Sequence, residues 1–362
     1  MGVDAEYGPL VSAWPDPRFL ALVGTGHPIL LAPMAGAGGV DLCVGAMAGG
    51  ALGALPCGML SPEAAIAQAA EVRSRASGPL NLNFFCHSEP PATDDGPWRA
   101  LLAPYRAEFG VEAEGGVALR RPFDEAMCEA VEEIRPEVAS FHFGLPNEGL
   151  LARVKAAGAH VLGNATSVAE AHWLAERGAD AVIAQGWEAG GHSGRFLGAD
   201  PAEAMGLIAL LPQVADAVDI PVIAAGGIGD GRGIAAALTL GASAVQLGTA
   251  YLHCPESLIS TAHRAALAGE PTRFTNLLTG GLARGVAGRL VRELGAVRPE
   301  APPYPLAAAA LAPIRAAAEA RGESGFGPMW AGQSGPLGRA LPAAELTRAL
   351  AADALAILGR RA

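Results

Sequence analysis

Two histidines and several side-chain amides stand where short apolar runs of the sequence end, and these residue types could bind and orient a small polar ligand. His142 closes the run VASFHF, and His192 lies in the glycine-flanked turn AGGHSG. Because histidine titrates near neutral pH, either one could act as a general base or as a partner to an oxyanion. Asn83, Asn164 and Gln185 end other apolar runs. The sequence therefore predicts a ligand site, with His192 as the first catalytic candidate and His142 as the second.

A set of small residues follows two later apolar runs, in AAGGIGDGRG and VQLGTAYL. Gly226, Gly227, Gly248 and Thr249 would expose backbone N–H groups there, and a helix is expected to begin near Asp230. Amides and a helix N-terminus together attract an anion, so this pattern predicts a phosphate site. The chain contains neither GxGxxG nor GxxxxGK[ST], which argues against a Rossmann or P-loop site.

Several other kinds of catalytic chemistry lack the residues that they need. No pair of histidines has the spacing of metal ligands, so no metal is expected. The sequence GHSGR around Ser193 is not a GxSxG nucleophile elbow, and the five cysteines contain no CxxC. Lys155 is the only lysine and lies in a helical pattern, which argues against Schiff-base chemistry.

The elements that must position these residues alternate between short apolar runs and longer Ala-rich helical patterns. Strands are predicted at 29–33, 51–56, 79–85, 138–143, 160–164, 180–185, 221–226 and 244–248. Helices are predicted near 40–49, 61–76, 98–109, 123–134, 147–157, 167–177, 201–217, 230–239 and 257–268. This alternation is typical of a parallel sheet covered on both faces, and eight strands favour a closed (β/α)8 TIM barrel, whose site lies at the C-terminal strand ends. Gly158, Gly178 and Gly241 precede three strands and are expected to be left-handed helix ends.

The rhythm of strand and helix stops after about residue 252, which divides the chain. We expect a ligand-binding barrel over 1–252, a smaller capping region rich in Gly, Arg and Pro over 253–340, and a C-terminal helix over 341–362 that docks on the barrel. The segment 86–122 is longer than a barrel connection needs, so we expect an elaborated loop there.

Composition and net charge limit which kinds of partner the protein is expected to bind. The chain has 362 residues, 51% of them hydrophobic and 17% charged, which is enough to bury a core. Its net charge of −11 disfavours nucleic acid and anionic membranes as partners. The N-terminus has no basic region ahead of an apolar core, so a signal peptide is not expected. Two long stretches rich in apolar residues, 19–40 and 42–62, are broken by Gly and Pro, so we expect buried strands and turns there and not membrane helices. We expect a cytoplasmic protein, monomeric or homodimeric.

The motifs LAPMAGAGG, NLNFFCH, SFHFGLP, GADAVIAQGWEAGGHSG, PVIAAGGIGDGRGIAAALTLGASAVQLGTAYL and MWAGQ resemble those of the nitronate monooxygenases, formerly called 2-nitropropane dioxygenases. The resemblance covers about residues 28–252, with MWAGQ near the end of the chain. NFFCH, SFHFGLP and MWAGQ resemble the class that prefers propionate 3-nitronate. The resemblance implies an FMN-dependent barrel with a smaller capping domain.

Together with the glycines named above, the resemblance assigns FMN contacts to residues at the strand ends. These are Pro33, Met34, Asn83, Gln185, Gly190, Gly191, Gly226, Gly227, Gln246, Leu247, Gly248 and Thr249. His192 matches the family histidine placed to take the α-proton of a nitroalkane. In the class that this chain resembles the substrate is already an anion, so the resemblance implies that His192 orients or stabilises it instead.

The implied reaction is FMN-dependent oxidation of an alkyl nitronate by O2 to a carbonyl compound and nitrite, through a flavin semiquinone. Arg273 and Arg284 are candidate partners for a substrate carboxylate, beside His142 and His192. The FMN motifs do not separate this reaction from NAD(P)H-dependent reduction of a quinone or an enoyl thioester. A non-redox lyase or isomerase would need an acid/base pair, and Glu188 is the only carboxylate near these strand ends. A flavin-binding regulator without turnover is the fourth alternative.

Overall fold

The computed structural model describes residues 13–112, 119–198 and 200–359. Its larger lobe is a ring of parallel strands in the order β1-β9-β8-β6-β5-β4-β3-β2. The strands are β1 (Ile29–Leu31), β2 (Gly53–Pro56), β3 (Leu80–Phe85), β4 (Val138–His142), β5 (His160–Ala165), β6 (Ala181–Gln185), β8 (Val222–Ala225) and β9 (Ala244–Leu247). Seven of them lie within a run that the sequence predicts to be a strand, and β5 extends one residue beyond the predicted run 160–164.

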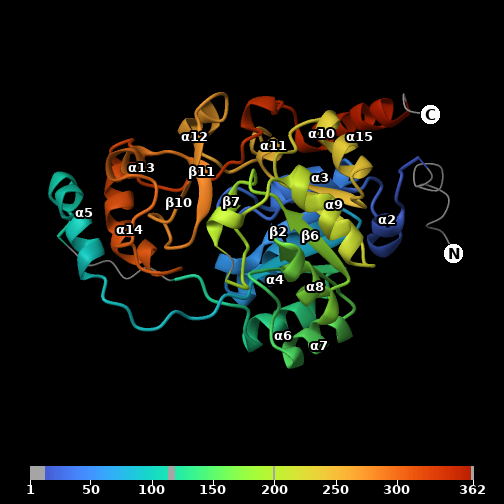
Figure 1. Ribbon diagram of the computed structural model, residues 1–362, viewed down its shortest axis with the longest axis horizontal. Helices are drawn as coiled ribbons and strands as arrows, with labels where there is room; N and C mark the ends of the chain where they lie inside the picture. The colour runs from blue at the N-terminus through green and yellow to red at the C-terminus, as the bar shows by residue number, and fades with distance from the viewer. Residues whose placement is uncertain (1–12, 113–118, 199, 360–362) are drawn as a thin grey trace.

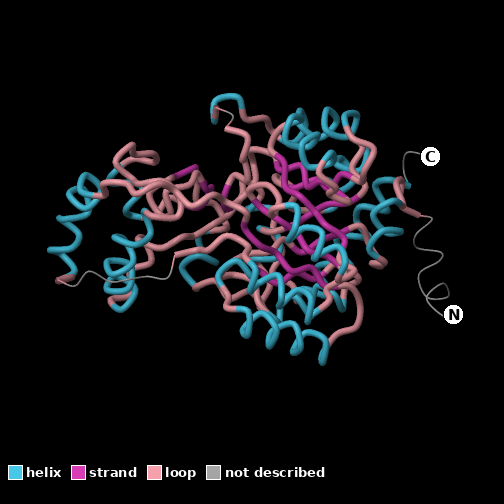
Figure 2. The backbone as a smooth tube through the Cα atoms, turned by 90° about the horizontal axis from the view of Figure 1, so that it is seen from below, coloured by secondary structure: helices cyan, strands magenta, loops and turns pink. Residues whose placement is uncertain are grey.

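The ring is closed between its first two strands by backbone hydrogen bonds. Leu31 N donates to Leu52 O at 3.0 Å, and Leu52 N donates to Ile29 O at 2.9 Å. Helices cover the outside of the ring (Figure 2). Nearly every strand residue is buried. The prediction of a (β/α)8 barrel is confirmed.

Helices follow the strands around the ring. They are α3 (Val40–Ala48), α4 (Pro62–Arg75), α6 (Glu125–Ile134), α7 (Glu148–Ala156), α8 (Val168–Glu176), α9 (Leu207–Ala217) and α10 (Gly231–Thr239), with the short α11 (Thr249–Leu252) after β9. Capping residues explain several starts, since the side chains of Ser61, Asp124, Asn147 and Ser167 each accept a hydrogen bond from a backbone N–H of the first turn.

The helix ends follow from glycine. Gly158, Gly178 and Gly241 have φ of 98°, 88° and 102°, which confirms the positive φ expected before these strands. The helix predicted over 201–217 is divided, because Pro201–Glu203 forms a separate 3-10 turn and α9 begins only after Gly206.

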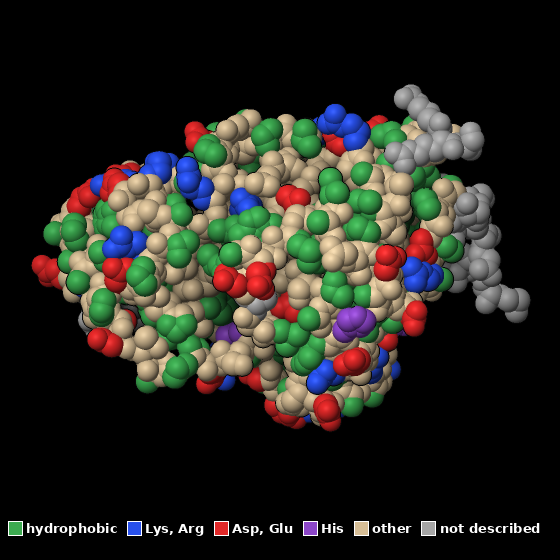
Figure 3. Space-filling model, in the orientation of Figure 1, with side chains coloured by type: hydrophobic (Ala, Val, Ile, Leu, Met, Phe, Trp, Pro, Cys, Tyr) green, Lys and Arg blue, Asp and Glu red, His purple; other side chains and the backbone are tan. Residues whose placement is uncertain are grey.

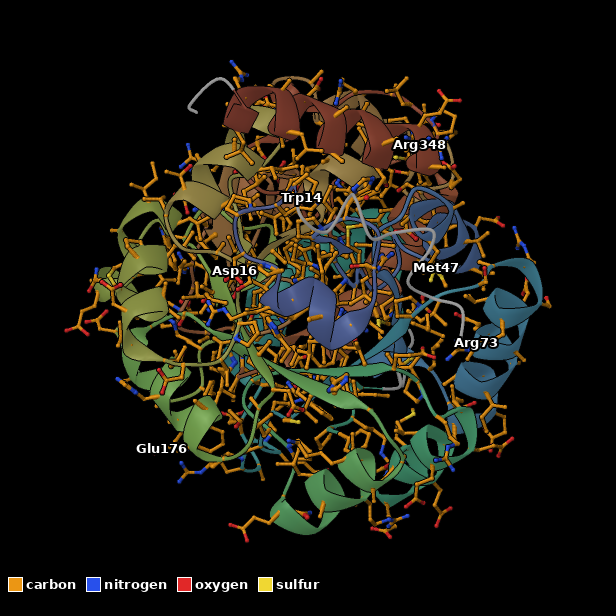
Figure 4. The ribbon with its side chains drawn as sticks, turned by 90° about the vertical axis from the view of Figure 1, so that its right-hand side faces the viewer. Trp14, Asp16, Met47, Arg73, Glu176 and Arg348 are labelled. Atoms are coloured by element: carbon orange, nitrogen blue, oxygen red, sulfur yellow. The ribbon has the colours of Figure 1, made fainter. Side chains whose placement is uncertain are left out.

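One end of the barrel is covered by the segment that precedes β1. The helix α2 (Arg18–Val23) lies across this end, beside Trp14 and Asp16 (Figure 4). Trp14 is 4% exposed, and the carboxylate of Asp16 accepts hydrogen bonds from Ser243 Oγ and from the guanidinium of Arg18. A ligand must therefore enter from the opposite end, where the strands finish.

The smaller lobe lies at that opposite end and is assembled from distant parts of the chain (Figure 1). It contains β10 (Thr272–Thr275), β11 (Ala283–Val286), α13 (Arg289–Leu294) and α14 (Ala307–Ala320). It also contains α5 (Gly96–Phe109), which leaves the barrel after β3 and packs on α14. Trp98, for example, is fully buried there and donates its indole N–H to Ala307 O at 3.1 Å. The helix predicted near 98–109 is thus present, but it lies in the core of the smaller lobe and not in a loop of the barrel.

Two further elements, β7 (Gly191–His192) and α15 (Ala343–Gly359), join distant parts of the chain. The strand β7, from the loop after β6, pairs with β11, so a barrel loop completes the small sheet of the other lobe. The outline of the molecule is notched where the lobes meet (Figure 3). The C-terminal α15 packs on α10 and α3 of the barrel. Among the described residues, no helix combines the length and apolarity needed to cross a bilayer.

Candidate functional site

A cavity of about 580 Å³ opens at the C-terminal ends of the strands, between the two lobes. Such a volume suits a cofactor with a small substrate. The residues predicted from the sequence that line it are Pro33, Met34, Asn83, His142, Gln185, Gly190, Gly191, His192, Gly226, Gly227, Gln246, Gly248 and Thr249. The predicted site residues therefore share one cavity, with Leu247 as the exception.

The exception follows from the alternation of side chains along β9. Gln246 faces the cavity, so its neighbour Leu247 points the other way and is 1% exposed in the barrel core. The carbonyl of Leu247 accepts a hydrogen bond from Ala32 N at 2.9 Å, so it supports β1 rather than the cavity.

The ends of β8 and β9 form a wall of backbone. Gly226 and Gly227 have φ of 110° and 70°, values that L-residues rarely adopt. Among the described residues, the amides of Gly226, Gly227, Gly248 and Thr249 have no backbone acceptor. The hydroxyl of Thr249 accepts a hydrogen bond from Gly332 N at 2.8 Å. Free amides at two adjacent strand ends are what a phosphate group needs.

The sequence predicts that the first turn of the helix after Gly227 also binds the anion, but the side chain of Asp230 already bonds its amides. Asp230 Oδ1 accepts hydrogen bonds from Arg232 N at 3.0 Å and from Gly233 N at 3.3 Å. The first turn of α10 therefore has less to offer an anion than the sequence suggests, because a carboxylate already bonds its amides.

The floor of the cavity is a hydrogen-bonded network around Gln185. Its Oε1 accepts from Gly194 N at 2.8 Å and from Asn164 Nδ2 at 3.2 Å, while its Nε2 donates to His192 O at 2.9 Å. On the next strands, Asn83 Nδ2 donates to Ser140 Oγ at 3.0 Å. Gln185 therefore fixes the path of the loop that carries His192.

Two elements hold His192 itself. Its backbone pairs with Ala283 of β11, and its Nε2 lies 2.8 Å from the hydroxyl of Thr279. The side chain is 9% exposed, and burial, followed by the positive charge of Arg120, holds the pKa of His192 well below its usual value. His192 is therefore a neutral imidazole at neutral pH.

His142 lies beside His192 and is likewise neutral. Its Nε2 lies 3.2 Å from His192 O, and because a carbonyl only accepts, that nitrogen must carry the proton. Burial lowers the pKa of His142 to about 4. His142 thus holds the backbone of His192 in place and leaves its Nδ1 as an acceptor.

An aromatic wall faces these histidines, and the sequence did not identify it. Phe143 follows His142 with a φ of 67°, a strained value for a bulky residue and one that recurs at functional sites. The Tyr304 ring lies 5.3 Å from that of Phe143 and 5.1 Å from that of His192. The Trp330 ring, in the motif MWAGQ, is 5.5 Å from His192. Its neighbour Gly332 binds Thr249, so MWAGQ bridges the two sides of the cavity.

Three more polar residues lie near the cavity. His263 lines it, whereas His87 is absent from its wall and packs 4.8 Å from the Tyr304 ring. Glu188 has a structural role, since its carboxylate accepts a hydrogen bond from Leu207 N, the first residue of α9, at 2.9 Å. It is therefore no free acid or base.

The two arginines suggested from the sequence as carboxylate partners, Arg273 and Arg284, do not line the cavity. Arg284 is 5% exposed and donates to Trp187 O at 3.0 Å, away from the cavity, and Arg273 is exposed on β10. The arginines on the cavity wall are Arg120 and Arg315. Arg315 is paired with Glu319 at 2.7 Å, and Glu319 is the only carboxylate of the described cavity wall. Arg120 therefore leaves the wall with a net positive charge.

The residues present fit a flavin with a phosphate. Gln246 Oε1 is buried on the cavity wall with no partner among the described residues, and an N–H on the edge of a heterocycle would satisfy it. The glycine amides of β8 and β9 would hold a phosphate. Within the described residues, no cluster of histidine, cysteine and carboxylate side chains could hold a metal ion.

Comparisons with known proteins agree with this geometry. A family model described as nitronate monooxygenase matches residues 17–353. The chain is 42% identical over 344 residues to a nitronate monooxygenase of Paraburkholderia phytofirmans, covering 91% of this chain and 93% of that protein. It is 41% identical over 345 residues to a nitronate monooxygenase of Pseudomonas aeruginosa, covering 92% and 97%.

Two solved structures have the same architecture. A nitroalkane oxidase from Streptomyces ansochromogenes has a TM-score of 0.88 at 36% identity, covering 95% of this chain and 100% of that one. FabK from Thermotoga maritima has a TM-score of 0.74 at 26% identity, covering 95% and 97%. The similarity covers 95% of this chain and so extends over both lobes.

Proposed function

Because this chain belongs to the nitronate monooxygenase family of flavin-dependent oxidoreductases, we propose that it binds FMN and oxidises an alkyl nitronate of the propionate 3-nitronate type. The products would be a carbonyl compound and nitrite, with O2 as the oxidant. The observation that carries the proposal is the charge of the cavity wall. The wall carries Arg120, which pairs with no described carboxylate, and two neutral histidines. Its one described carboxylate, Glu319, is already paired, so the wall suits a small anion.

The backbone wall would hold the FMN phosphate on the amides of Gly226, Gly227, Gly248 and Thr249. Gln246 Oε1 would accept a hydrogen bond from the ring edge, and Pro33 and Met34 would flank the ring. Bound FMN supplies an electron acceptor for the nitronate and a route for electrons to O2. That the electrons pass one at a time stays a prediction.

His192 would orient the nitronate rather than remove a proton from carbon. Since its pKa is held low, the neutral imidazole is a weak base, which is poorly suited to abstracting a proton from a nitroalkane. A nitronate has already lost that proton. The histidine would then meet the anion with a hydrogen bond, while the surrounding aromatic side chains exclude water.

The decisive experiment uses the purified protein without oxygen. We expect its visible spectrum to contain bound flavin, propionate 3-nitronate to bleach it, and NADPH to leave it unchanged. Bleaching by NADPH and not by the nitronate would move the assignment to a quinone or enoyl-thioester reductase. A protein that carries no flavin and binds none on titration with FMN would end the cofactor assignment.

Two expectations from the sequence lie outside the site and stay predictions. These are the cytoplasmic location and the choice between a monomer and a homodimer. Sedimentation of the purified protein would decide the second.

A further inference from the structure

Arg120 is a charged group of the cavity wall that packs on the Tyr304 ring and has no acidic partner among the described residues. It lines the cavity, and its Nε is buried without a partner among the described residues. No described carboxylate pairs with it, whereas its exposed neighbour Arg121 lies 3.7 Å from Asp124. A partly buried guanidinium with no acid beside it is costly unless a ligand supplies the negative charge.

The structure holds Arg120 at a fixed place. Three residues later, Phe123 N donates to Phe85 O at 2.7 Å, at the end of β3. The Phe123 ring packs 4.8 Å from that of Phe84 and 5.3 Å from that of Phe141. The chain on one side of Arg120 is therefore tied to two barrel strands.

Arg120 and His192 lie around the same aromatic ring. The guanidinium carbon of Arg120 is 5.9 Å from the centre of the Tyr304 ring, and the His192 ring is 5.1 Å from it. After burial, the charge of Arg120 is the largest influence lowering the pKa of His192, so its field reaches the place where the nitronate is proposed to lie. A substrate about one aromatic ring in length could touch both groups.

We propose that Arg120 binds a carboxylate at the far end of the nitronate substrate and so selects nitronates that carry a second negative charge. This assignment rests on the proposed function. Arginine suits the task because its planar fork of N–H donors matches a carboxylate. A site built to pair a carboxylate also discriminates strongly against an analogue that lacks one, since the buried guanidinium is then left unpaired.

The test compares two three-carbon substrates, propionate 3-nitronate and propyl-1-nitronate, of which only the first has a carboxylate. For Arg120→Gln we expect the ratio of their kcat/KM values to fall at least tenfold, mainly through a higher KM for propionate 3-nitronate. Arg120→Lys keeps the charge without the fork and should give an intermediate ratio. The matched control Arg121→Gln should keep the wild-type ratio, and flavin content should be equal in all variants.

A second measurement needs no turnover. Succinate is an inert dianion of the same chain length as propionate 3-nitronate. Its affinity for the flavin-loaded protein, measured by calorimetry, should fall at least tenfold in Arg120→Gln and stay unchanged in Arg121→Gln.

The two proposals fail separately. A wild-type protein that oxidises neither nitronate would refute the proposed function, and succinate binding would still decide the role of Arg120. An unchanged substrate ratio in Arg120→Gln, or an equal loss on both substrates with loss of flavin, would refute the carboxylate assignment.

Discussion

The cavity has two sides that are built by different means. On the side of β8 and β9 the chain offers backbone amides from two short glycine segments, 226–227 and 248–249. On the other side it offers the side chains of His142, His192 and Arg120, which come from separate parts of the chain. Thr279 and Tyr304 of the smaller lobe contact these side chains. Backbone amides suit a phosphate, which is the same in every turnover, whereas side chains can be exchanged to select a substrate. In the proposed complex the cofactor and the substrate would contact different sides of the cavity, so recognition of one can change without the other.

The largest effect should come from damage to the backbone side. In Gly226→Ala the new Cβ would lie 3.0 Å from Ala189 N, at a φ of 110°. The left-handed backbone alone costs about 1–2 kcal/mol, and the loop after β6 must also move. We expect affinity for FMN to fall roughly 100-fold, equivalent to about 3 kcal/mol, as measured by fluorescence titration.

The matched control for that variant is Gly158→Ala. Gly158 has a φ of 98° but nothing within 4 Å of the added Cβ, and it lies between α7 and β5, away from the cavity. It should lose a similar amount of stability and keep the flavin. An equal loss of flavin in both variants would show that general strain, and not the cradle, governs binding.

The next effect is on the pH dependence of stability and comes from the buried His142. The pKa of His142 is lowered to about 4 by burial, whereas in the unfolded chain it is about 6.5. The unfolded state therefore takes up a proton first as the pH falls, so the free energy of unfolding decreases between pH 6.5 and pH 4 and is unaffected above 6.5. His142 accounts for about 3 kcal/mol of this decrease at pH 4.

In His142→Gln that part of the pH dependence should disappear. Glutamine can still donate to the carbonyl of His192 but does not titrate. Urea unfolding at pH 7, 5.5 and 4.5 would measure the slope, with His172→Gln on the exposed surface of α8 as the control. A slope equal to that of the wild type would mean that His142 is already protonated or solvated in the folded protein.

The smallest effect should come from Thr279→Val, which removes the hydroxyl 2.8 Å from His192 Nε2. Losing one buried hydrogen bond costs about 1.4 kcal/mol, so we expect kcat/KM for the nitronate to fall about tenfold while flavin content stays constant. Steady-state kinetics would measure this, with Thr93→Val in an exposed segment as the control. If flavin were lost as well, the two sides of the cavity would not be independent.

The barrel could be predicted because its determinants are local. Continuous apolar runs such as 180–185 can only be strands buried on both faces, and positive-φ glycines such as Gly178 mark the turns that precede them. The smaller lobe could not be assembled in the same way. Helix α5 has an ordinary helical pattern, and nothing local indicates that its Trp98 packs against α14, about two hundred residues later.

The candidate site also contains residues that local sequence could predict and residues that it could not. The sequence could place Gly226, Gly227, Gly248 and Thr249 on the cavity wall because each pair follows a strand directly. Thr279, Tyr304 and Trp330 could not, although Thr279-Gly280-Gly281 and MWAGQ carry glycines that allow close packing. The misplacement of Arg284 has the same origin, because sequence shows a charge but not which side of a sheet it occupies.

Periodicity and turn chemistry act over a few residues, so the sequence was sufficient to predict the barrel, the strand ends that line the cavity, the glycines after β8 and β9 and the two histidines. The assembled fold was needed to show that the histidines are neutral, that Glu188 and Asp230 accept hydrogen bonds at helix starts, and that Arg120 and His192 lie near the same Tyr304 ring. Burial and charge pairing depend on which distant segments meet, and here they meet where the smaller lobe covers the barrel.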